Sequence, residues 1–443
     1  MPSTAPRGNA TQMPTTISTR VRTASIPILV LLITACGSPG PTGATAPQPA
    51  TSSGAPAVAS PEPAVSVPDP SPVVPDPSTE PTVTPQPTAT AVHVPTTWSS
   101  SSRIFGDGCS GPSATIDASG RFHVVVGCGM NVRYATSSDG RSWKTTLFRH
   151  PAHRFDVEPQ IAVDGSTLYV AFTRLRPTDG GCGDDGLVDV GVFLRTRQLP
   201  SGPWSAPVRI GQVGDHLQSF RVSDGAVHET VVTRDGVGPI VYRKQAGGST
   251  RSTRLPGAVE TSLRIGDDGR ARIAYSTGRT LRFATVDADG RVAARRIFDG
   301  RNLTVSRPIL VLGAGNHAYM TFTADRPYGG GCAEPDFEDS RIGTYFATDS
   351  NGTWNVKRLT RVPAETSLVV DVSTGRVDAI LGGARALRGF VRTPAGNWTN
   401  APVPRTADMS SPVVRRDPSN GTLLLVAVFF AGEHTAVVAM TER

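Results

Sequence analysis

The sequence lacks most of the patterns that mark common classes of enzyme. Its 443 residues contain no phosphate-binding glycine loop, no dinucleotide-binding fingerprint, no serine-nucleophile elbow and no zinc-binding His-Glu-x-x-His sequence. Basic residues are scattered, with no run of lysine and arginine and no basic stripe interleaved with aromatics. We therefore expect no nucleic-acid partner. No long stretch has the apolar period of a helix, so the fold class we expect is all-β.

Cysteine is also scarce, with five residues in the chain: Cys36, Cys109, Cys128, Cys182 and Cys332. They form no Cys-x-x-Cys pair and no cluster with histidine, so we expect no metal site and no cofactor. Cys36 stands apart near the N-terminus. The other four are an even number, which in an exported chain is typical of two disulfides.

No apolar run is long enough to span a bilayer. The apolar segment 26–35 is about half of the roughly 20 residues that a spanning helix needs. It follows Arg7, Arg20 and Arg22, and no acidic residue precedes Cys36. This arrangement predicts a secretory signal peptide over residues 1–35.

The signal peptide ends in Ile-Thr-Ala-Cys-Gly at residues 33–37. This ending resembles the lipobox of bacterial lipoproteins. The resemblance implies cleavage before Cys36, a diacylglycerol anchor on its thiol, and a mature protein held on the outer face of the cell membrane. The alternative is an ordinary signal peptide in which the cysteine is incidental.

Residues 36–92 are rich in Pro, Thr, Ser and Ala and carry few charges. A segment of this composition cannot bury a core, so we expect a disordered tether. The formal net charge of +7 falls to +4 once the three signal-peptide arginines are removed. A balance this modest does not by itself favour an acidic partner.

From residue 93 onwards, short alternating apolar runs are broken by Gly, Asp and Asn. Units of four such runs start near residues 113, 158, 216, 260, 307, 365 and 411. A period of about 40–50 residues is typical of one propeller blade. We predict a seven-bladed β-propeller over 93–443, with six blades as the alternative. The last unit has three strands, and 94–104 is expected to supply the fourth and close the ring.

A tandem β-sandwich would also contain short strands, but it predicts no residue at a fixed phase of the unit. Trp143, Trp204, Trp354 and Trp398 all lie at the same phase, just before the expected fourth strand of their units. This regularity favours the propeller.

Residues 137–143 read Ser-Ser-Asp-Gly-Arg-Ser-Trp. Asp139-Gly140 is a turn sequence, because glycine tolerates a positive φ and aspartate bonds its own backbone. The segment resembles the Asp-box, the neuraminidase repeat on the hairpins of sialidase-like β-propellers. In that family the Asp-boxes lie on the face opposite the binding site, and their role is structural.

The opposite face carries the blade-to-blade segments and the long second-to-third loops. Its polar residues are expected to surround the mouth of the central channel. The candidate ligand-binding residues are Arg154, Asp156, Glu158, Asp215, His216, Glu260, Arg307, Tyr328 and Glu365. They form either a polar pocket suited to acid/base chemistry, cations or sugar hydroxyls, or a set of strand-end caps that satisfy loop backbone.

Two long loops on this face are similar to each other. Residues 176–182 and 326–332 both begin Arg-Pro, end Gly-Gly-Cys and continue into acidic sequence. Cys109 and Cys128 flank the first two strands of the first unit, so that all four cysteines are expected on one face. The blade phasing predicts the pairs Cys109–Cys128 and Cys182–Cys332.

Three functions fit these observations. The first is a surface-anchored propeller that binds a glycan, a peptide or another cell-envelope ligand. The second is a sialidase-like glycoside hydrolase, for which the resemblance implies three substrate-binding arginines, the first in a Phe/Tyr-Arg-x-Pro sequence, with a Tyr nucleophile. The chain has only partial echoes of that sequence, at 220–223 and 306–308. The third is a purely structural envelope protein.

Overall fold

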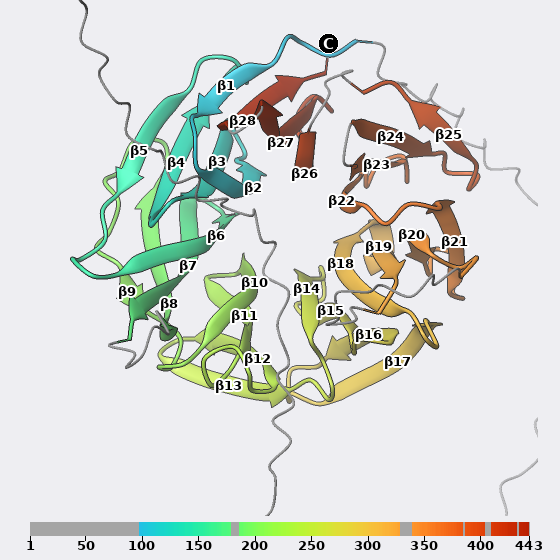
Figure 1. The fold of residues 1–443 in the computed structure, drawn as a ribbon, viewed down its shortest axis with the longest axis horizontal. Coiled ribbons are helices and arrows are strands. Elements are labelled where there is room, and N and C mark those ends of the chain that lie inside the picture. Colours follow the sequence, from blue (N-terminus) through green and yellow to red (C-terminus); the bar gives the residue numbers. More distant parts are fainter. Residues whose placement is uncertain are drawn as a thin grey trace, which may run out of the picture. The chain divides into compact units, whose positions relative to one another are not determined.

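A computed structural model describes residues 97–178, 186–327, 339–383, 386–403, 409–431 and 434–442. All of them belong to one structural unit, Thr90–Arg443. They form seven antiparallel four-stranded sheets arranged as blades around a central channel (Figure 1). The prediction of a seven-bladed β-propeller is therefore confirmed. The one helical element among the described residues is a short 3₁₀ turn, η1, at Ala314–Asn316.

The strands follow one another from the channel outwards in each of the first four blades. Blade 1 contains β2 Cys109–Ile116, β3 Phe122–Cys128, β4 Asn131–Ser137 and β5 Lys144–Phe148. Blade 2 contains β6 Phe155–Asp164, β7 Thr167–Pro177, β8 Leu187–Gln198 and β9 Val208–Arg209. Blade 3 contains β10 His216–Ser223, β11 Ala226–Val232, β12 Ile240–Ala246 and β13 Ser249–Arg254. Blade 4 contains β14 Glu260–Ile265, β15 Ala271–Ser276, β16 Thr280–Val286 and β17 Val292–Asp299.

The remaining blades keep the same order, except that the outer strand of the last one comes from the start of the domain. Blade 5 contains β18 Thr304–Leu312, β19 Ala318–Asp325, β20 Gly343–Thr348 and β21 Asn355–Thr360. Blade 6 contains β22 Glu365–Val370, β23 Val377–Gly382, β24 Leu387–Arg392 and β25 Trp398–Ala401. Blade 7 contains β26 Met409–Arg416, β27 Leu423–Ala431, β28 His434–Thr441 and β1 Ser102–Phe105.

The ring closes where β1 pairs antiparallel with β28. A bridge between Trp98 and Glu442 extends this pairing towards both ends of the domain. The predicted closing strand is thereby confirmed, and its inclusion in blade 7 covers a strand edge that would otherwise be open to another chain.

The inner strands are linked by a belt of hydrogen bonds from one blade to the next. The edge of an inner strand that faces the channel carries backbone N–H groups with no partner in their own sheet. Buried groups of this kind need an acceptor. In five of the inner strands a side-chain oxygen of the preceding blade supplies it. The pairs are Ile161 N to Ser113 Oγ, 3.2 Å; Phe220 N to Gln160 Oε1, 3.0 Å; Leu263 N to Ser219 Oγ, 3.1 Å; Leu310 N to Ser262 Oγ, 3.0 Å; and Val414 N to Ser367 Oγ, 2.9 Å.

The four tryptophans at the shared phase all contact the preceding blade. Trp204 packs edge-on against Tyr134 and Phe148 with ring centroids 5.0 and 4.9 Å apart. Trp354 lies 5.2 Å from Phe283, and Trp398 lies 4.8 Å from Phe346. Trp143 donates from its indole nitrogen to Ser102 Oγ of blade 7 at 3.2 Å. The periodic tryptophan therefore joins neighbouring blades, which explains why it recurs once per unit.

The turn at 137–143 is held by its own side chains. Asp139 Oδ1 accepts from the backbone N–H groups of Arg141 and Ser142, both at 2.8 Å. Ser137 Oγ accepts from Gly140 N at 2.9 Å. Gly140 has φ +70° and its α-carbon faces the Thr441 side chain so closely that a Cβ would clash. Both the conformation and the contact require glycine at this turn.

The predicted disulfide between Cys109 and Cys128 is present, and its Cα atoms are 4.0 Å apart. The two residues are directly opposite each other in the β2–β3 ladder. The predicted partners Cys182 and Cys332 lie outside the described residues, as do Cys36 and the signal and tether segments. Among the described residues there is no helix with the length and hydrophobicity needed to cross a bilayer.

Candidate functional site

The predicted site residues gather where the inner strands begin. Asp156, Glu158, His216, Glu260, Arg307 and Glu365 lie in the first half of β6, β10, β14, β18 or β22, and Arg154 and Asp215 directly precede β6 and β10. We call this set of eight residues the rim. Tyr328, the ninth predicted residue, lies outside the described part of the chain.

Asp156 is fully buried in an ion pair. Its carboxylate accepts from Arg174 Nε at 2.6 Å and from Arg174 Nη2 at 2.8 Å. The guanidinium also lies over the Phe193 ring, 4.4 Å from its centroid. A bidentate pair of this kind holds β6 against β7, and it leaves the Asp156 carboxylate with no route to a ligand.

Asp215 belongs to a second buried group in blade 3. Arg243 donates to both carboxylate oxygens of Asp215, through Nη1 and, at 3.2 Å, through Nη2. Arg243 Nη1 is also 3.7 Å from Glu229 Oε1, which accepts from Gln245 Nε2 at 3.2 Å. Burial raises the pKa of Glu229 to about 7, against the opposing charge of Arg243. One guanidinium thus serves two buried carboxyl groups.

His216 bridges two carboxylates of blade 2. Its Nδ1 is 3.0 Å from Asp189 Oδ1 and its Nε2 is 2.8 Å from Glu158 Oε2. Burial alone lowers the pKa of a histidine, but the hydrogen bonds to Asp189 and Glu158 outweigh it and raise the pKa of His216 to about 10. The His216 side chain is therefore an imidazolium at neutral pH, and its two hydrogen bonds join blade 3 to blade 2.

Glu260 and Glu365 each begin a Glu-Thr-Ser-Leu sequence, and both join their blade to the next one by the same kind of hydrogen bond. Glu260 accepts from the backbone N–H of Arg307, and Glu365 Oε2 accepts from Ser411 N at 2.7 Å and from Ser411 Oγ at 2.8 Å. Arg307 and Ser411 have φ of 54° and 48° and precede prolines at irregularities in β18 and β26. A backbone N–H turned out of the ladder needs an acceptor, and the glutamate of the preceding blade supplies one.

Two charged side chains of the rim, Glu158 and Arg307, are exposed to solvent. The Glu158 side chain is 54% exposed and that of Arg307 is 47% exposed, with Arg307 Nη1 3.8 Å from Glu365 Oε1. The rim therefore offers charged donors and acceptors to solvent. Its carboxylates are nonetheless joined to scaffold partners.

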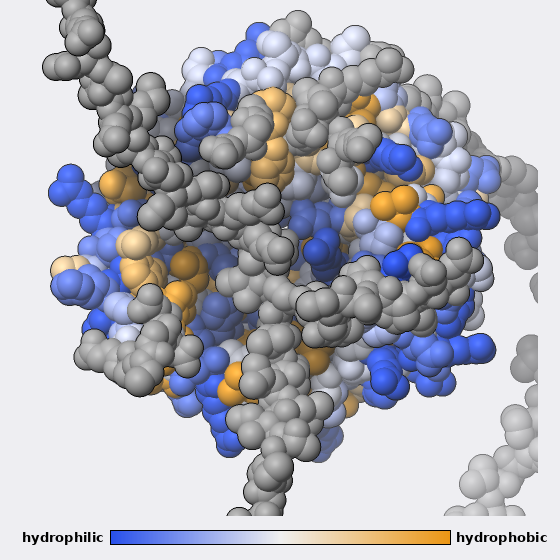
Figure 2. Space-filling view, viewed as in Figure 1, coloured by the Kyte–Doolittle hydropathy of each residue, from blue (hydrophilic) through white to orange (hydrophobic). Residues whose placement is uncertain are grey.

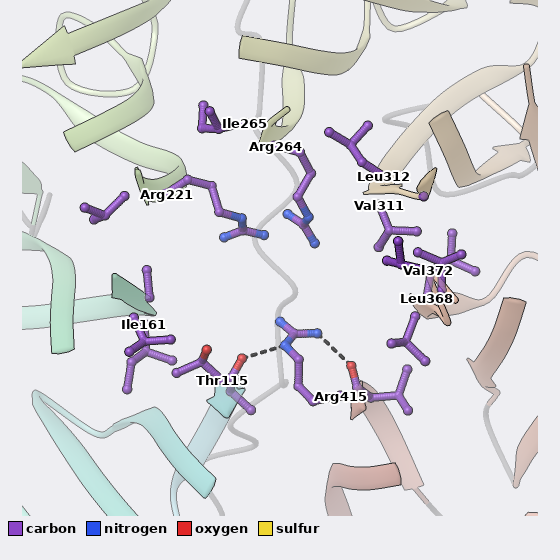
Figure 3. A pocket seen from close by; sticks show the side chains of 18 of the residues that line it. Thr115, Ile161, Arg221, Arg264, Ile265, Val311, Leu312, Leu368, Val372 and Arg415 are labelled. Carbon is purple, nitrogen blue, oxygen red and sulfur yellow. Dashed lines mark hydrogen bonds between the residues drawn. The ribbon is translucent and has the colours of Figure 1, made fainter. Parts of the chain in front are cut away.

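A cavity of about 410 Å³ lies further along the channel, at the ends of the inner strands and the turns that follow them. We call it the channel cavity. Figure 3 shows Arg221, Arg264 and Arg415 converging on it from β10, β14 and β26, between apolar side chains of the other inner strands. It is separated from the rim by most of the length of the inner strands.

The surface of the face in Figure 2 is hydrophilic over most of its periphery, and the apolar residues visible there form small separate patches. The described residues contain no group of three or more His, Cys, Asp or Glu placed to hold a metal ion.

No protein-family model and no curated protein matches the chain. Solved structures show similarity in fold. An unknown-function protein from Dyadobacter fermentans is 11% identical with a TM-score of 0.49, and the match covers 77% of this chain and 98% of that one. A polysaccharide lyase, the PL25 ulvan lyase, is 10% identical with a TM-score of 0.50, covering 76% and 94%. Trypanosoma rangeli sialidase is 10% identical with a TM-score of 0.44, covering 76% of this chain and 55% of that one.

Several site residues escaped the sequence patterns. Arg174, Arg243 and Glu229 are scaffold partners of predicted residues, and nothing in their local sequence marks them. Asp189 was visible only as part of the acidic sequence that follows Cys182. The channel arginines had a signal, because each follows a buried apolar residue at the same phase of an inner strand, in Phe220-Arg221, Leu263-Arg264 and Val414-Arg415. Comparing the inner strands position by position would have aligned them.

Proposed function

We propose that this chain is a lipid-anchored β-propeller of the cell envelope that binds a glycan at the rim without cleaving it. The observation that carries the proposal is the state of the rim carboxylates. Asp156, Asp215, Glu260 and Glu365 each accept hydrogen bonds from a neighbouring strand or blade, so none is free to act as the acid, base or nucleophile of a glycosidase. Charged groups at the surface remain for binding.

A glycan is the ligand class to test first. The rim exposes the Glu158 carboxylate and the Arg307 guanidinium, which suit the hydroxyl and acidic groups of sugars. A structure with the same fold, the PL25 ulvan lyase, is a polysaccharide lyase that has been seen bound to -[GlcA(1-4)Rha3S]-. A peptide ligand is the second choice.

The alternative function is a sialidase-like glycoside hydrolase. It is favoured by the resemblance of 137–143 to the Asp-box. It is disfavoured by the missing Phe/Tyr-Arg-x-Pro sequence and by the engaged carboxylates of the rim.

The binding proposal predicts saturable retention of the mature protein on an immobilised acidic polysaccharide, with no release of reducing ends or unsaturated sugars. Arg307→Gln should weaken retention several-fold, because it removes an exposed positive charge of the rim. Glu158→Gln should not weaken retention, because it removes an exposed negative charge. Arg254→Gln is the matched control, since Arg254 is exposed on outer strand β13. Turnover of a sialoside or another aryl glycoside that disappears in Glu260→Gln would instead establish the hydrolase.

The anchor proposal is tested separately. The full-length chain, expressed in a bacterium with a lipoprotein pathway and fed an alkyne fatty acid, should carry the label and partition with the membrane. Cys36→Ser should be unlabelled, because only the Cys36 thiol can receive the diacylglycerol group. Cys109→Ser serves as a cysteine control that keeps the label. Equal labelling of wild type and Cys36→Ser would contradict the anchor.

A further inference from the structure

One layer of the channel contains residues at the same position of all seven inner strands. The interblade hydrogen bonds align the strands, and the residue that follows each aligned position faces the channel cavity. These residues are Thr115, Ala162, Arg221, Arg264, Val311, Val369 and Arg415. The three arginines therefore lie at one height along the channel, and Figure 3 shows their guanidinium groups directed towards its middle.

The guanidinium groups have few protein partners. Arg264 Nη1 donates to Leu263 O at 2.8 Å, and Arg221 Nη1 donates to Phe220 O. Arg415 donates to Ala114 O at 2.6 Å through Nε and to Val414 O at 2.7 Å through Nη1. In the described part of the chain, none of the three forms an ion pair with a carboxylate, and most of their N–H groups have no protein acceptor.

Three positive charges close together in the channel cavity repel one another. Burial, together with the charge of Arg415, lowers the pKa of Arg221 to about 9, and burial lowers the pKa of Arg415 to about 10. Asp267 is the one carboxylate among the described residues that line the cavity, and it is exposed at the turn after β14. The three arginines are half-buried, and like charges gathered in one cavity without a carboxylate partner favour a counter-ion from outside the protein.

We propose that the channel cavity is a binding site for a polyvalent oxyanion, the sulfate or phosphate group of a small ligand. Guanidinium groups bind such oxyanions through paired N–H donors, and three of them match an anion with more than one negative charge. The cavity, at about 410 Å³, is far larger than the roughly 30 Å³ that a water molecule takes in the liquid. It can therefore take the group together with part of the molecule that bears it.

This site is independent of the glycan proposed at the rim. The rim lies at the beginnings of the inner strands, whereas the arginines lie near their ends, next to the first-to-second turns. Loss of binding at one site leaves the other intact, so failure of either proposal is recognised by itself.

The experiment is isothermal titration of the mature protein with sodium sulfate and with sodium phosphate, at ionic strength held constant with sodium chloride. Wild type should bind each anion saturably with one site per chain, and acetate should bind at least tenfold more weakly. Arg221→Gln and Arg415→Gln should each lose tenfold or more in affinity, while Arg254→Gln on the outer strand should keep wild-type affinity. Asp267→Asn should bind more tightly than wild type. Glucose 6-sulfate and glucose 6-phosphate then distinguish the two ligand sources.

Thermal unfolding guards against variants that fold poorly. Without added anion, Arg221→Gln should unfold at a temperature equal to or above that of wild type, because it relieves repulsion with Arg415. Sulfate stabilises most proteins by exclusion from their surfaces, and that effect would be the same in every variant. A sulfate response of equal size in wild type, Arg221→Gln and Arg254→Gln, or the absence of saturable binding to wild type, would overturn the proposal.

Discussion

Replacing Arg243 with methionine should lower the free energy of unfolding by about 3–5 kcal/mol at pH 8. The substitution keeps the apolar stem but leaves two buried carboxyl groups, Asp215 and Glu229, without their shared cation. Chemical unfolding followed by tryptophan fluorescence measures the loss. Arg254→Met, on the exposed end of β13, should change the free energy by less than about 0.5 kcal/mol.

The loss in Arg243→Met should shrink as the pH falls, because the Glu229 carboxyl group, whose pKa is raised by burial, can then take up a proton. Adding Asp215→Asn and Glu229→Gln to Arg243→Met should restore much of the stability, since the triple variant buries no uncompensated charge. A loss that is the same at pH 5 and pH 8, or that the triple variant does not recover, would show that the effect comes from packing of the arginine stem rather than from charge.

Replacing His216 with glutamine should remove a pH-dependent part of the stability, on the order of 5 kcal/mol below pH 6.5. The folded pKa of His216 is about 10 and its ordinary value is 6.5. The folded state thus holds a proton that the unfolded state releases. The contribution is fully present below pH 6.5 and is lost as the pH rises towards 10.

Unfolding of wild type and His216→Gln at pH 6, 8 and 10 tests this expectation. The two free energies should differ most at pH 6 and converge towards pH 10. His434→Gln is the control, because His434 is exposed and its ring lies 3.1 Å from Asp107 at the surface. A difference between wild type and His216→Gln that stays constant over this range would mean that His216 is neutral in the fold.

Both predictions concern residues that the sequence placed in a ligand site. In the structure Asp215 and His216 join strands and blades, and a change at either is expected to affect stability before it affects binding. Loss of activity or binding in variants of these residues is therefore informative only when the variant is shown to be folded. The exposed Arg307 and Glu158 are better probes of the rim.

The fold was readable from the sequence because its signals are local. Turn sequences such as Asp139-Gly140, apolar alternation within strands and a tryptophan once per unit act over a few residues, and each blade repeats them. The closing strand could be predicted by counting strands, since the last unit has three and residues 94–104 supply a fourth from the start of the domain. The Cys109–Cys128 pair followed from the same phasing, because the two residues flank a single hairpin.

The partners of the site residues depended on the tertiary structure. Asp156 pairs with Arg174 across a strand pair, His216 meets Glu158 across a blade boundary, and Glu365 reaches Ser411 in the next blade. The channel arginines meet only because β10, β14 and β26 enclose one cavity. Sequence by itself determined the repeating blade, because hydrogen bonding and side-chain alternation are fixed by near neighbours. Which charges are paired and which face the channel depended on the tertiary structure. The contacts concerned join residues far apart in the sequence, which come together only when the seven blades close into a ring.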